Sequence, residues 1–448
     1  MNENRMLFVN IASYRDPELI PTLKDMLAMV KKPQNLRIAI CWQHDDPTPD
    51  YFTNSGMTLL TKEKNEEHSL WCFEWQQAHI EVIAVHYLLS QGACWARYWG
   101  ETRYAGEDFV LQIDSHCRFV RHWDSEMIAM LDDLRTLSAK PVLSTYPPPY
   151  QPDQHDEKRG SFTSRLIFRE FSKEGLPMLS STPVNSDVPV RNCYLAGGFI
   201  FADGNFVREV ANDPQIFFAG EEIAMAARAW THGYDIYTPH KILLWHYYER
   251  KQEPKVWGDL NREAKDNGEV RMAWWERDAI SKKRICSLFG LEESPVESGN
   301  YGLGTIRTLT EFERHIGVDF RRRAVLPEVL GKEKVSFIPP ENQINDADWE
   351  HRLLSPFQKH ITLKKSEIGV TSTLSGWWYL GIYCAKNRLL EEKKLSASEL
   401  KVMLDKSEGD EFKLDINFST RPQQAPSIVR LCSFDETNGW GDVVEKTW

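Results

Sequence analysis

The chain has 448 residues, and 42% of them are hydrophobic, including 16 Trp, 15 Tyr and 21 Phe, so we expect two or three domains with substantial apolar cores. Its 54 basic and 65 acidic side chains give a formal net charge of −11, which argues against a nucleic acid as the main partner because phosphate binding depends on Lys and Arg. A local basic pocket for a diphosphate stays compatible with this charge.

The N-terminal sequence, the length of the apolar runs and the cysteine positions predict a cytoplasmic protein without a membrane span. Residues 1–5 lack the basic-then-apolar pattern of a secretory signal, and no uncharged run approaches the roughly 18 residues that a spanning helix needs. The cysteines, at positions 41, 72, 94, 117, 193, 286, 384 and 432, show neither a Cys-x-x-Cys pair nor zinc-like spacing. We therefore expect reduced thiols that belong to the core.

The first elements form a predicted strand, helix and strand. Residues 7–12 are apolar, and a helix should follow with Asp16 as its N-cap and Pro17 at its first position. Apolar residues then recur at helical spacing up to Val30. Residues 36–42 are nearly continuously apolar, as in the buried strands of parallel sheets.

The next segments continue this alternation. Residues 45–75 are polar and rich in turn formers. Residues 80–85 predict a strand, and residues 93–99 predict a helix that leads to another short strand ending near residue 114. The alternation indicates a three-layer α/β domain, in which ligands bind at the carboxyl ends of the strands.

A candidate metal site lies at the end of that short strand. Asp114 and His116 are two residues apart, and residues i and i+2 of an extended segment point to one side. They could therefore offer an oxygen and an imidazole nitrogen to one divalent cation. His246 ends a second apolar run, 242–246, and is the best downstream candidate for another ligand. Alternatively, Asp114 caps a turn and His116 is a satisfied, partly buried histidine.

Two loops separate the later elements. The proline-rich segment 146–153 predicts a rigid exposed loop, either a plain connector or a segment that faces a substrate. Residues 299–304 predict a loop before a helix at 307–316.

From about residue 335 the pattern changes to short strand-like segments around one helix near 397–405, which a Ser396/Glu399 capping box opens. The strand-like segments are 361–363, 369–374, 377–383, 412–418 and 427–434. We predict two domains, an α/β domain at 1–330 and a mostly β accessory domain at 335–448.

Several motifs together carry a resemblance to a known family. They lie at 10–17, 92–97, 112–116, 123–124, 301–304 and 307–309. With these motifs the chain resembles glycosyltransferases of the GT-A fold, and most closely the cytosolic N-acetylglucosaminyltransferases that modify hydroxyproline on a ubiquitin-ligase adaptor. A more distant likeness is to the mucin-type polypeptide N-acetylgalactosaminyltransferases, which share the Asp-Ser-His, Ala-Gly-Gly and Gly-Glu motifs found here at 114–116, 196–198 and 220–221. The resemblance covers most of residues 5–325.

The resemblance implies a nucleotide-sugar site that contains a metal. Asp114, His116 and His246 would be the metal ligands, with Mn²⁺ expected and Mg²⁺ as the alternative. Arg97 stands where related enzymes place an arginine near the nucleotide, and Arg15 is the second basic candidate. Arginine suits bidentate phosphate recognition, but each of the two could instead form a surface ion pair.

Four further residues are assigned to donor binding. Ser13 and Gln43 stand at the ends of the first two predicted strands and would face the base or ribose, an assignment that rests on position alone. Gly197 and Gly198 precede the apolar run 199–201, where glycine allows the backbone to approach the sugar ring closely. A simple hairpin turn explains the two glycines equally well without the resemblance.

Glu221 and Glu222 are the catalytic candidates. They open a predicted helix at 223–230, where their charge would ordinarily favour the positive end of the helix dipole. The resemblance implies that Glu221 contacts the donor sugar or the acceptor hydroxyl, whereas Glu222 replaces the usual Asn or Asp. The resembling families retain the anomeric configuration and need no protein nucleophile. An inverting enzyme would need a carboxylate base, for which Glu221 or Asp124 would serve.

The function that follows is metal-dependent, retaining transfer of N-acetylglucosamine from UDP-GlcNAc to a hydroxyl acceptor, such as one on a protein. Two alternatives stay open. The enzyme could transfer another hexose to a glycan or small acceptor, because the motif does not encode donor choice. The chain could also be a non-catalytic carbohydrate-binding or scaffold protein, with the aromatic-rich C-terminal residues holding glycans or simply packing as a core.

Overall fold

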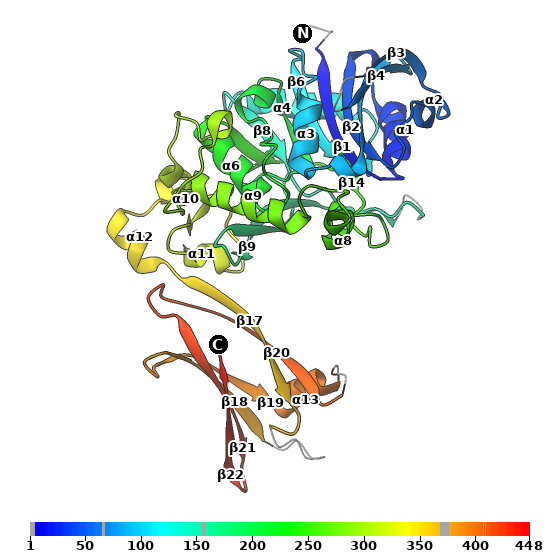
Figure 1. Ribbon diagram of the computed structural model, residues 1–448. Coiled ribbons are helices and arrows are strands. Elements are labelled where there is room, and N and C mark those ends of the chain that lie inside the picture. Colours follow the sequence, from blue (N-terminus) through cyan, green and yellow to red (C-terminus); the bar gives the residue numbers. More distant parts are fainter. Residues whose placement is uncertain (1–4, 65–67, 154–157, 368–375, 406, 408) are drawn as a thin grey trace. The chain divides into compact units, whose positions relative to one another are not determined.

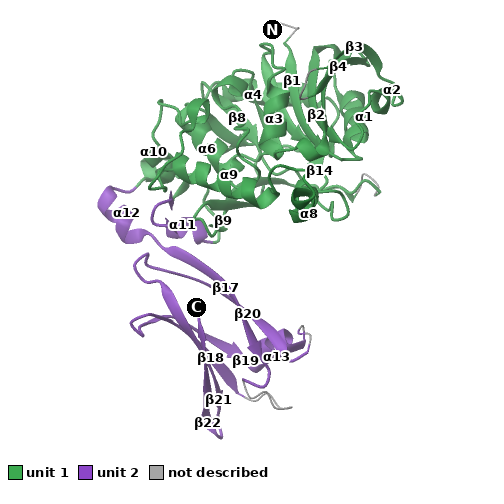
Figure 2. Cartoon of the chain, viewed as in Figure 1, with its two compact units in different colours: residues 1–317, 332–343 green, residues 318–331, 344–448 purple. Residues whose placement is uncertain are grey.

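A computed structural model describes residues 5–64, 68–153, 158–367, 376–405, 407 and 409–448 (Figure 1). The chain divides into two compact units (Figure 2), with residues 1–317 and 332–343 in unit 1, and residues 318–331 and 344–448 in unit 2. The strand predicted at 369–374 lies outside the described residues. None of the described helices has both the length and the apolar character needed to cross a bilayer.

Unit 1 is built on a ten-stranded mixed sheet with the strand order β11-β13-β8-β12-β6-β1-β2-β5-β4-β3. The central strands β6 (Phe109–Asp114), β1 (Leu7–Tyr14), β2 (Leu36–His44) and β5 (Ala78–His86) run parallel, whereas β12 (Phe199–Asp203) pairs antiparallel with β6. The outer strands are β4 (Ser69–Trp75) and β3 (Thr58–Lys64) at one edge, and β8 (Pro141–Ser144), β13 (Asp235–Thr238) and β11 (Val190–Asn192) towards the other.

Helices cover both faces of this sheet. Leu7, Val9 and Ile11 of β1 share one apolar cluster with residues of α1 (Leu19–Met29) and α4 (Trp123–Leu134). On the other face of β1, the Asn10 side chain donates a hydrogen bond of 2.9 Å to the Arg97 carbonyl in α3 (Ala93–Glu101). Successive strand residues alternate between faces, so α3 lies opposite α1 and α4. The predicted three-layer α/β arrangement is confirmed.

Shorter elements of unit 1 surround the carboxyl ends of the central strands. The antiparallel pair β7 (Cys117–Phe119) and β14 (Leu244–His246) sets His246 opposite Cys117. Two longer helices, α6 (Glu221–Thr231) and α9 (Trp274–Leu288), pack against each other. The other elements are α2 (Asp50–Thr53), α5 (Phe206–Glu209), α7 (Val256–Asp259), α8 (Arg262–Asp266), α10 (Leu309–Ile316), the hairpin β9 (Thr163–Phe171) and β10 (Pro177–Val184), and the short helices η1 (Pro33–Asn35), η2 (Tyr87–Leu89), η4 (Gly299–Tyr301) and η5 (Pro340–Asn342).

Unit 2 is mostly β. A four-stranded antiparallel sheet has the order β19-β18-β21-β22, and β17 pairs with β20. The predicted capping box is present, because the Ser396 hydroxyl accepts the Glu399 amide and the Glu399 carboxylate accepts the Ser396 amide. The elements are β15 (Val318–Asp319), β16 (Ala324–Val325), α11 (Pro327–Leu330), α12 (Asp346–Arg352), β17 (Ser355–Lys364), β18 (Trp377–Cys384), β19 (Leu389–Ser396), α13 (Ala397–Asp405), β20 (Glu411–Thr420), β21 (Pro426–Asp435) and β22 (Gly439–Thr447).

The polar, turn-rich segment 45–75 contains regular elements that were not predicted from the sequence. This segment contains α2 and two antiparallel strands, β3 and β4. The pattern that was missed is the alternation of Trp71, Phe73 and Trp75, which are all buried on one side of β4. Every residue of β3 is exposed, so this edge strand carries no such pattern in its sequence.

The predicted N-cap of the first helix is also wrong. Helix α1 begins at Leu19 with Glu18 at the N-cap position, so Pro17 lies outside the helix. One carboxylate oxygen of Asp16 accepts the Glu18 amide at 3.0 Å, and the other accepts from the ring of His116 at 2.7 Å. The Asp16 side chain is therefore drawn towards the buried histidine rather than into the helix.

The proline-rich segment 146–153 is irregular, as predicted, but much of it is buried rather than exposed. Pro147, Pro148 and Tyr150 are all buried. The His246 amide donates to the Pro148 carbonyl at 3.0 Å, and the Tyr150 amide donates to the His246 carbonyl at 3.1 Å. The segment therefore lies along β14 and fixes the backbone of His246.

Candidate active site

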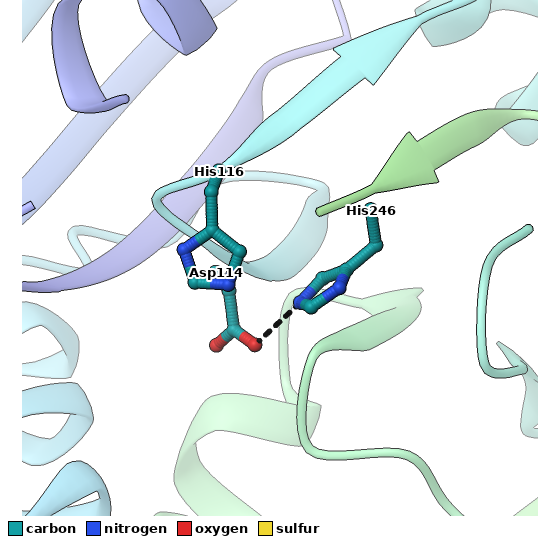
Figure 3. Close-up of side chains that lie close together, drawn as sticks. All are labelled: Asp114, His116 and His246. Atoms are coloured by element: carbon teal, nitrogen blue, oxygen red, sulfur yellow. Dashed lines mark hydrogen bonds and ion pairs between the residues drawn. The ribbon is translucent and has the colours of Figure 1, made fainter. Parts of the chain in front are cut away.

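Three predicted metal ligands converge at the carboxyl end of β6 (Figure 3). Asp114 is the last residue of that strand, His116 follows in the turn to β7, and His246 ends β14, which pairs with β7. One ligand atom from each residue lies within 4.8 Å of the others, and Asp114 Oδ2 is 3.1 Å from His246 Nε2. Strand pairing thus brings together residues that are 132 positions apart in the sequence.

The donor set of this cluster suits a divalent cation. One carboxylate and two imidazoles bind first-row metals at about 2.0–2.2 Å, so atoms this close can reach one ion with small side-chain movements. Burial lowers the pKa of His116 to about 4, although its hydrogen bond to Asp16 opposes that shift. Burial alone would raise the pKa of Asp114, but the His246 hydrogen bond and the Arg97 charge lower it well below its usual range. A neutral imidazole and an ionised carboxylate are the forms that bind metals.

Arg97 joins the metal-ligand candidate to the catalytic candidate. Its Nη2 donates to Asp114 Oδ1 at 3.1 Å, and its Nη1 donates to Glu221 Oε1 at 2.9 Å. The Arg97 side chain is only 3% exposed, and a buried guanidinium is stable only with such partners. The thiol of Cys94, one turn earlier in α3, donates to Glu221 Oε2 at 2.9 Å. Glu221 is therefore held on both oxygens.

Glu222 occupies a separate, partly buried position beside Glu221. Its Oε1 accepts the Gly197 amide at 3.0 Å, and its Oε2 accepts the Tyr146 hydroxyl. Burial raises the pKa of Glu222 to about 7, and the charge of Glu221 adds to the shift. The carboxyl group of Glu222 therefore changes its charge near neutral pH.

Neighbouring carboxylates leave no room for a side chain at Gly197 or Gly198. A Cβ atom at Gly197 would lie 2.3 Å from Glu221 Oε1, and one at Gly198 would lie 2.8 Å from Asp114 Oδ2. The backbone of this turn therefore passes directly against two carboxylates, which any larger residue would displace. From the sequence we expect a close approach to the sugar, and the close approach that the structure shows is to these side chains.

A cavity of about 480 Å³ opens beside the cluster. Asp114, His116, His246, Glu221 and Glu222 all line it.

Other predicted residues reach the cavity to different degrees. Gln43 lines it and donates to the Ser13 carbonyl at 3.2 Å. Ser13 itself is fully buried, and the residues at this end of β1 that line the cavity are Ala12 and Tyr14. Strand alternation places Ser13 on the opposite side from these two.

Arg15 and Asp124 have their own partners outside the cavity lining. Arg15 pairs with Asp259 at 2.9 Å and Asp45 at 3.0 Å, and its guanidinium lies over the ring of Tyr87. The Asp124 carboxylate accepts the backbone amides of residues 31 and 32, and Asp124 lines a different cavity. The structure therefore gathers most, but not all, of the predicted site residues.

Two basic residues of the cavity were missed by the sequence analysis. Arg250 and Lys255 line it and follow His246 closely in the sequence. Arg250 pairs with Asp16 at 3.2 Å, and burial lowers the pKa of Lys255, with repulsion from Arg250 adding to the shift. Their position just after the apolar run that ends at His246 could have indicated, from the sequence, that they lie near the site.

Comparison with known proteins gives one family and several structures. Residues 6–322 match the family described as Glycosyltransferase (GlcNAc). The crystal structure of GalNAc-T7 with UDP, GalNAc and Mn²⁺ has a TM-score of 0.43 and 14% identity, covering 70% of this chain and 55% of that one. This chain thus spans little more than half the length of GalNAc-T7 in that structure. No curated protein sequence matches the chain.

Two further solved structures are similar to the chain. TarS of S. aureus has a TM-score of 0.35 and 11% identity over 99% of this chain and 77% of its own. The mannosyltransferase PcManGT from Pyrobaculum calidifontis, in complex with GDP-Man and Mn²⁺, has a TM-score of 0.34 and 10% identity over 56% of this chain and 59% of its own. The family match spans most of the chain and all of the cavity residues. The chain belongs to the Glycosyltransferase (GlcNAc) family.

Proposed function

We propose that the protein is a metal-dependent, retaining glycosyltransferase that moves N-acetylglucosamine from UDP-GlcNAc to a hydroxyl acceptor. The observation that carries this proposal is the convergence of Asp114, His116 and His246 in the wall of the cavity. These three residues would hold Mn²⁺, or Mg²⁺ as the alternative. When bound, such an ion supplies Lewis-acid stabilisation to the departing diphosphate, generally worth several kcal/mol.

The chain's own cations support a diphosphate in the same cavity. Arg250 and Lys255 bring two basic side chains to a protein whose net charge is −11. Arg250 can donate several hydrogen bonds to phosphate oxygens, and Lys255 contributes a compact charge. Among the pairs that the described residues form, Lys255 has no carboxylate within ion-pair distance. Arg97 also lines the cavity, but its Nη1 and Nη2 atoms already pair with Glu221 and Asp114. The diphosphate is therefore assigned to Arg250 and Lys255.

Retention is proposed from the families that the sequence resembles. An inverting transfer would need a general base within hydrogen-bond reach of the acceptor hydroxyl. The carboxylates among the cavity-lining residues are Asp16, Asp114, Glu221 and Glu222, and each accepts a hydrogen bond or ion pair on both oxygens. A retaining transfer, in which the leaving phosphate takes the acceptor proton, needs no such base.

The donor and acceptor are the finer parts of the proposal. The family description supports N-acetylglucosamine as the donor sugar, and another hexose is the alternative because the motifs do not encode donor choice. The hydroxyl acceptor would be on a protein, as in the hydroxyproline-modifying enzymes that the sequence resembles.

The test is turnover with a panel of sugar nucleotides, measured as free nucleoside diphosphate with and without Mn²⁺. We expect UDP-GlcNAc to be consumed only with metal, and the product to keep the donor's anomeric configuration by NMR. A hydroxyproline peptide and a free sugar serve as competing acceptors. Turnover that is unaffected by chelation would contradict the metal site, and an inverted product would contradict the mechanism.

Substitutions test whether this turnover depends on the three metal-ligand candidates. Asp114→Ala and His116→Ala should each abolish metal-dependent turnover while the fold is kept. The matched control is His360→Ala, which removes a histidine–aspartate pair from the surface of unit 2, where His360 and Asp415 are 60% and 66% exposed. Normal activity in either cluster variant would refute the assignment.

A further inference from the structure

Two adjacent charged residues at the end of β1, Arg15 and Asp16, differ in their exposure to solvent. Arg15 is partly exposed and pairs with Asp45 and Asp259. The side chain of Asp16 is fully buried and lines the cavity. Burying an ionised carboxylate costs several kcal/mol unless it is paired and hydrogen-bonded. The position of Asp16 therefore calls for a reason beyond its hydrogen bond to the Glu18 amide.

One oxygen of Asp16 gathers three donors. Its Oδ2 lies 2.7 Å from His116 Nδ1 and 3.2 Å from Arg250 Nη2, and it also accepts the hydroxyl of Ser115. His116 and Ser115 come from the turn after β6, about a hundred residues away in the sequence. Arg250 comes from the segment after β14. Asp16 is thus a common partner of a metal-ligand candidate and of a cavity cation.

This contact determines which nitrogen of His116 is available. An ionised carboxylate only accepts hydrogen bonds, so the Nδ1 atom of His116 must carry the hydrogen. A neutral imidazole carries one N–H, and its Nε2 atom then holds a lone pair. Nε2 is the atom left to bind an ion together with Asp114 and His246. A carboxylate behind a metal-bound histidine fixes both the tautomer and the ring orientation.

We propose that Asp16 is a positioning residue of the active site, which holds His116 with Nε2 towards the cation and Arg250 towards the diphosphate. This inference rests on the proposed function. It gives the buried aspartate of the motif at 10–17 a role that its neighbour Arg15 does not share. The metal ligand and the phosphate-binding cation are thereby set by one carboxylate, so that a change at Asp16 disturbs both.

The test compares Asp16→Asn with the control Asp45→Asn, which changes an aspartate that pairs with Arg15 and is 51% exposed. Titration calorimetry with Mn²⁺ alone measures metal affinity, and thermal unfolding verifies the fold of each variant. We expect Asp16→Asn to weaken Mn²⁺ binding about 10–100-fold, as is typical for loss of such a partner. Asp45→Asn should bind Mn²⁺ as the wild type does. Unchanged affinity in a folded Asp16→Asn protein would overturn the proposal.

A second readout separates this inference from the proposed function. ¹⁵N NMR of histidine-labelled, metal-free wild type should show His116 with its hydrogen on Nδ1, and Asp16→Asn should lose that preference. A wild type with the hydrogen on Nε2 would overturn the role of Asp16, whatever the metal result. If the wild type binds no Mn²⁺, the proposed metal site fails, and the tautomer alone decides whether Asp16 orients His116.

Steady-state kinetics test the proposed role of Asp16 in holding Arg250. Asp16→Asn should raise KM for UDP-GlcNAc as well as lower kcat, because Arg250 loses its anchor. Arg250→Gln should raise KM for the donor while Mn²⁺ affinity stays close to the wild-type value. If Arg250→Gln lost as much Mn²⁺ binding as Asp16→Asn, the assignment of the metal to His116 and of the diphosphate to Arg250 would be overturned.

Discussion

The two units bury different kinds of side chain. At the strand ends of unit 1, charged groups such as Asp16, Arg97 and Glu221 are nearly inaccessible to solvent. In unit 2 the sheet core is an entirely apolar cluster, and the buried polar or charged side chains among its described residues are Asp319, Ser355 and Thr420. Buried charge costs free energy unless it is paired, and Asp16, Arg97 and Glu221 all line the one cavity that also holds the metal-ligand candidates.

Aromatic residues show the same contrast within unit 2. Trp378 is 4% exposed and belongs to the apolar cluster of the four-stranded sheet. Its neighbour Trp377 points to the other face of β18 and packs against Phe434 and Trp440, and Trp440 is 58% exposed. Alternation along β18 thus divides the aromatic residues into a core group and a surface group. The following predictions test this contrast between buried charge, buried aromatic and exposed aromatic.

The largest effect is expected from Arg97→Met. Removing this buried guanidinium leaves Asp114 and Glu221 without their shared partner, which costs about 3–5 kcal/mol in other buried pairs. We expect a fall of that size in the free energy of unfolding, measured by urea denaturation, together with loss of transferase turnover. Arg430→Gln, which breaks an ion pair with Glu445 on unit 2, should leave both the urea midpoint and turnover unchanged. Equal loss in the two variants would remove the distinction between the units.

The second prediction concerns the core of unit 2. Trp378→Ala should destabilise the protein by about 3–5 kcal/mol, because deleting a buried aromatic ring removes its transfer free energy and leaves a cavity. The measurement is urea denaturation followed by a probe of unit 2, such as amide exchange in β18. Since no residue of the site lies in unit 2, turnover per folded molecule should stay at the wild-type level. A fall in turnover of the folded variant would assign unit 2 a direct part in catalysis.

How much of the site the sequence predicts depends on the range of the interactions. Asp114 and His116 are two residues apart on a strand, so local alternation predicts that they act together. His246 could be proposed because it also ends an apolar run. The alternation of strands and helices predicted the α/β fold, which is confirmed, and the resemblance joined the three residues into one predicted metal site.

The contacts of Asp16 and Arg250 could not be predicted in this way. Asp16 precedes a helix and is followed by Pro17, so its local sequence predicts an N-cap. Only the packing of β1 beside β6 brings Asp16 to His116. Arg250 lies in an irregular segment whose sequence carries no period. The exposed edge strand β3 was missed for a related reason, because a strand without a buried face has no alternation to detect.

The third prediction is a pH dependence of stability caused by Glu222. Its folded pKa is about 7, against an ordinary value of 4.5. Between these two pH values the unfolded chain has released a proton that the folded protein keeps, so the wild type loses stability as pH rises through this window. Glu222→Gln cannot ionise. Its free energy of unfolding relative to the wild type should therefore increase by about 3 kcal/mol from pH 4.5 to pH 7.

Urea denaturation at several pH values measures this difference, in which the other titrating groups cancel. Glu74→Gln, at an exposed position on β4, is the matched control and should show a constant difference from the wild type. A constant difference for Glu222→Gln as well would mean that its carboxyl group is ionised throughout this range, contrary to its burial.

The smallest effect is expected at the surface aromatic group. Trp440→Ala removes a side chain that is 58% exposed and contacts Trp377 and Phe434 at ring-centroid distances of 5.3 and 5.0 Å. Such pairs contribute about 0.5–1.5 kcal/mol beyond burial, so the urea midpoint should move far less than in Trp378→Ala. The comparison of the two variants is decisive, because both remove the same ring from the same sheet. A loss in Trp440→Ala that equals the loss in Trp378→Ala would show that this outer group is packed as a second core.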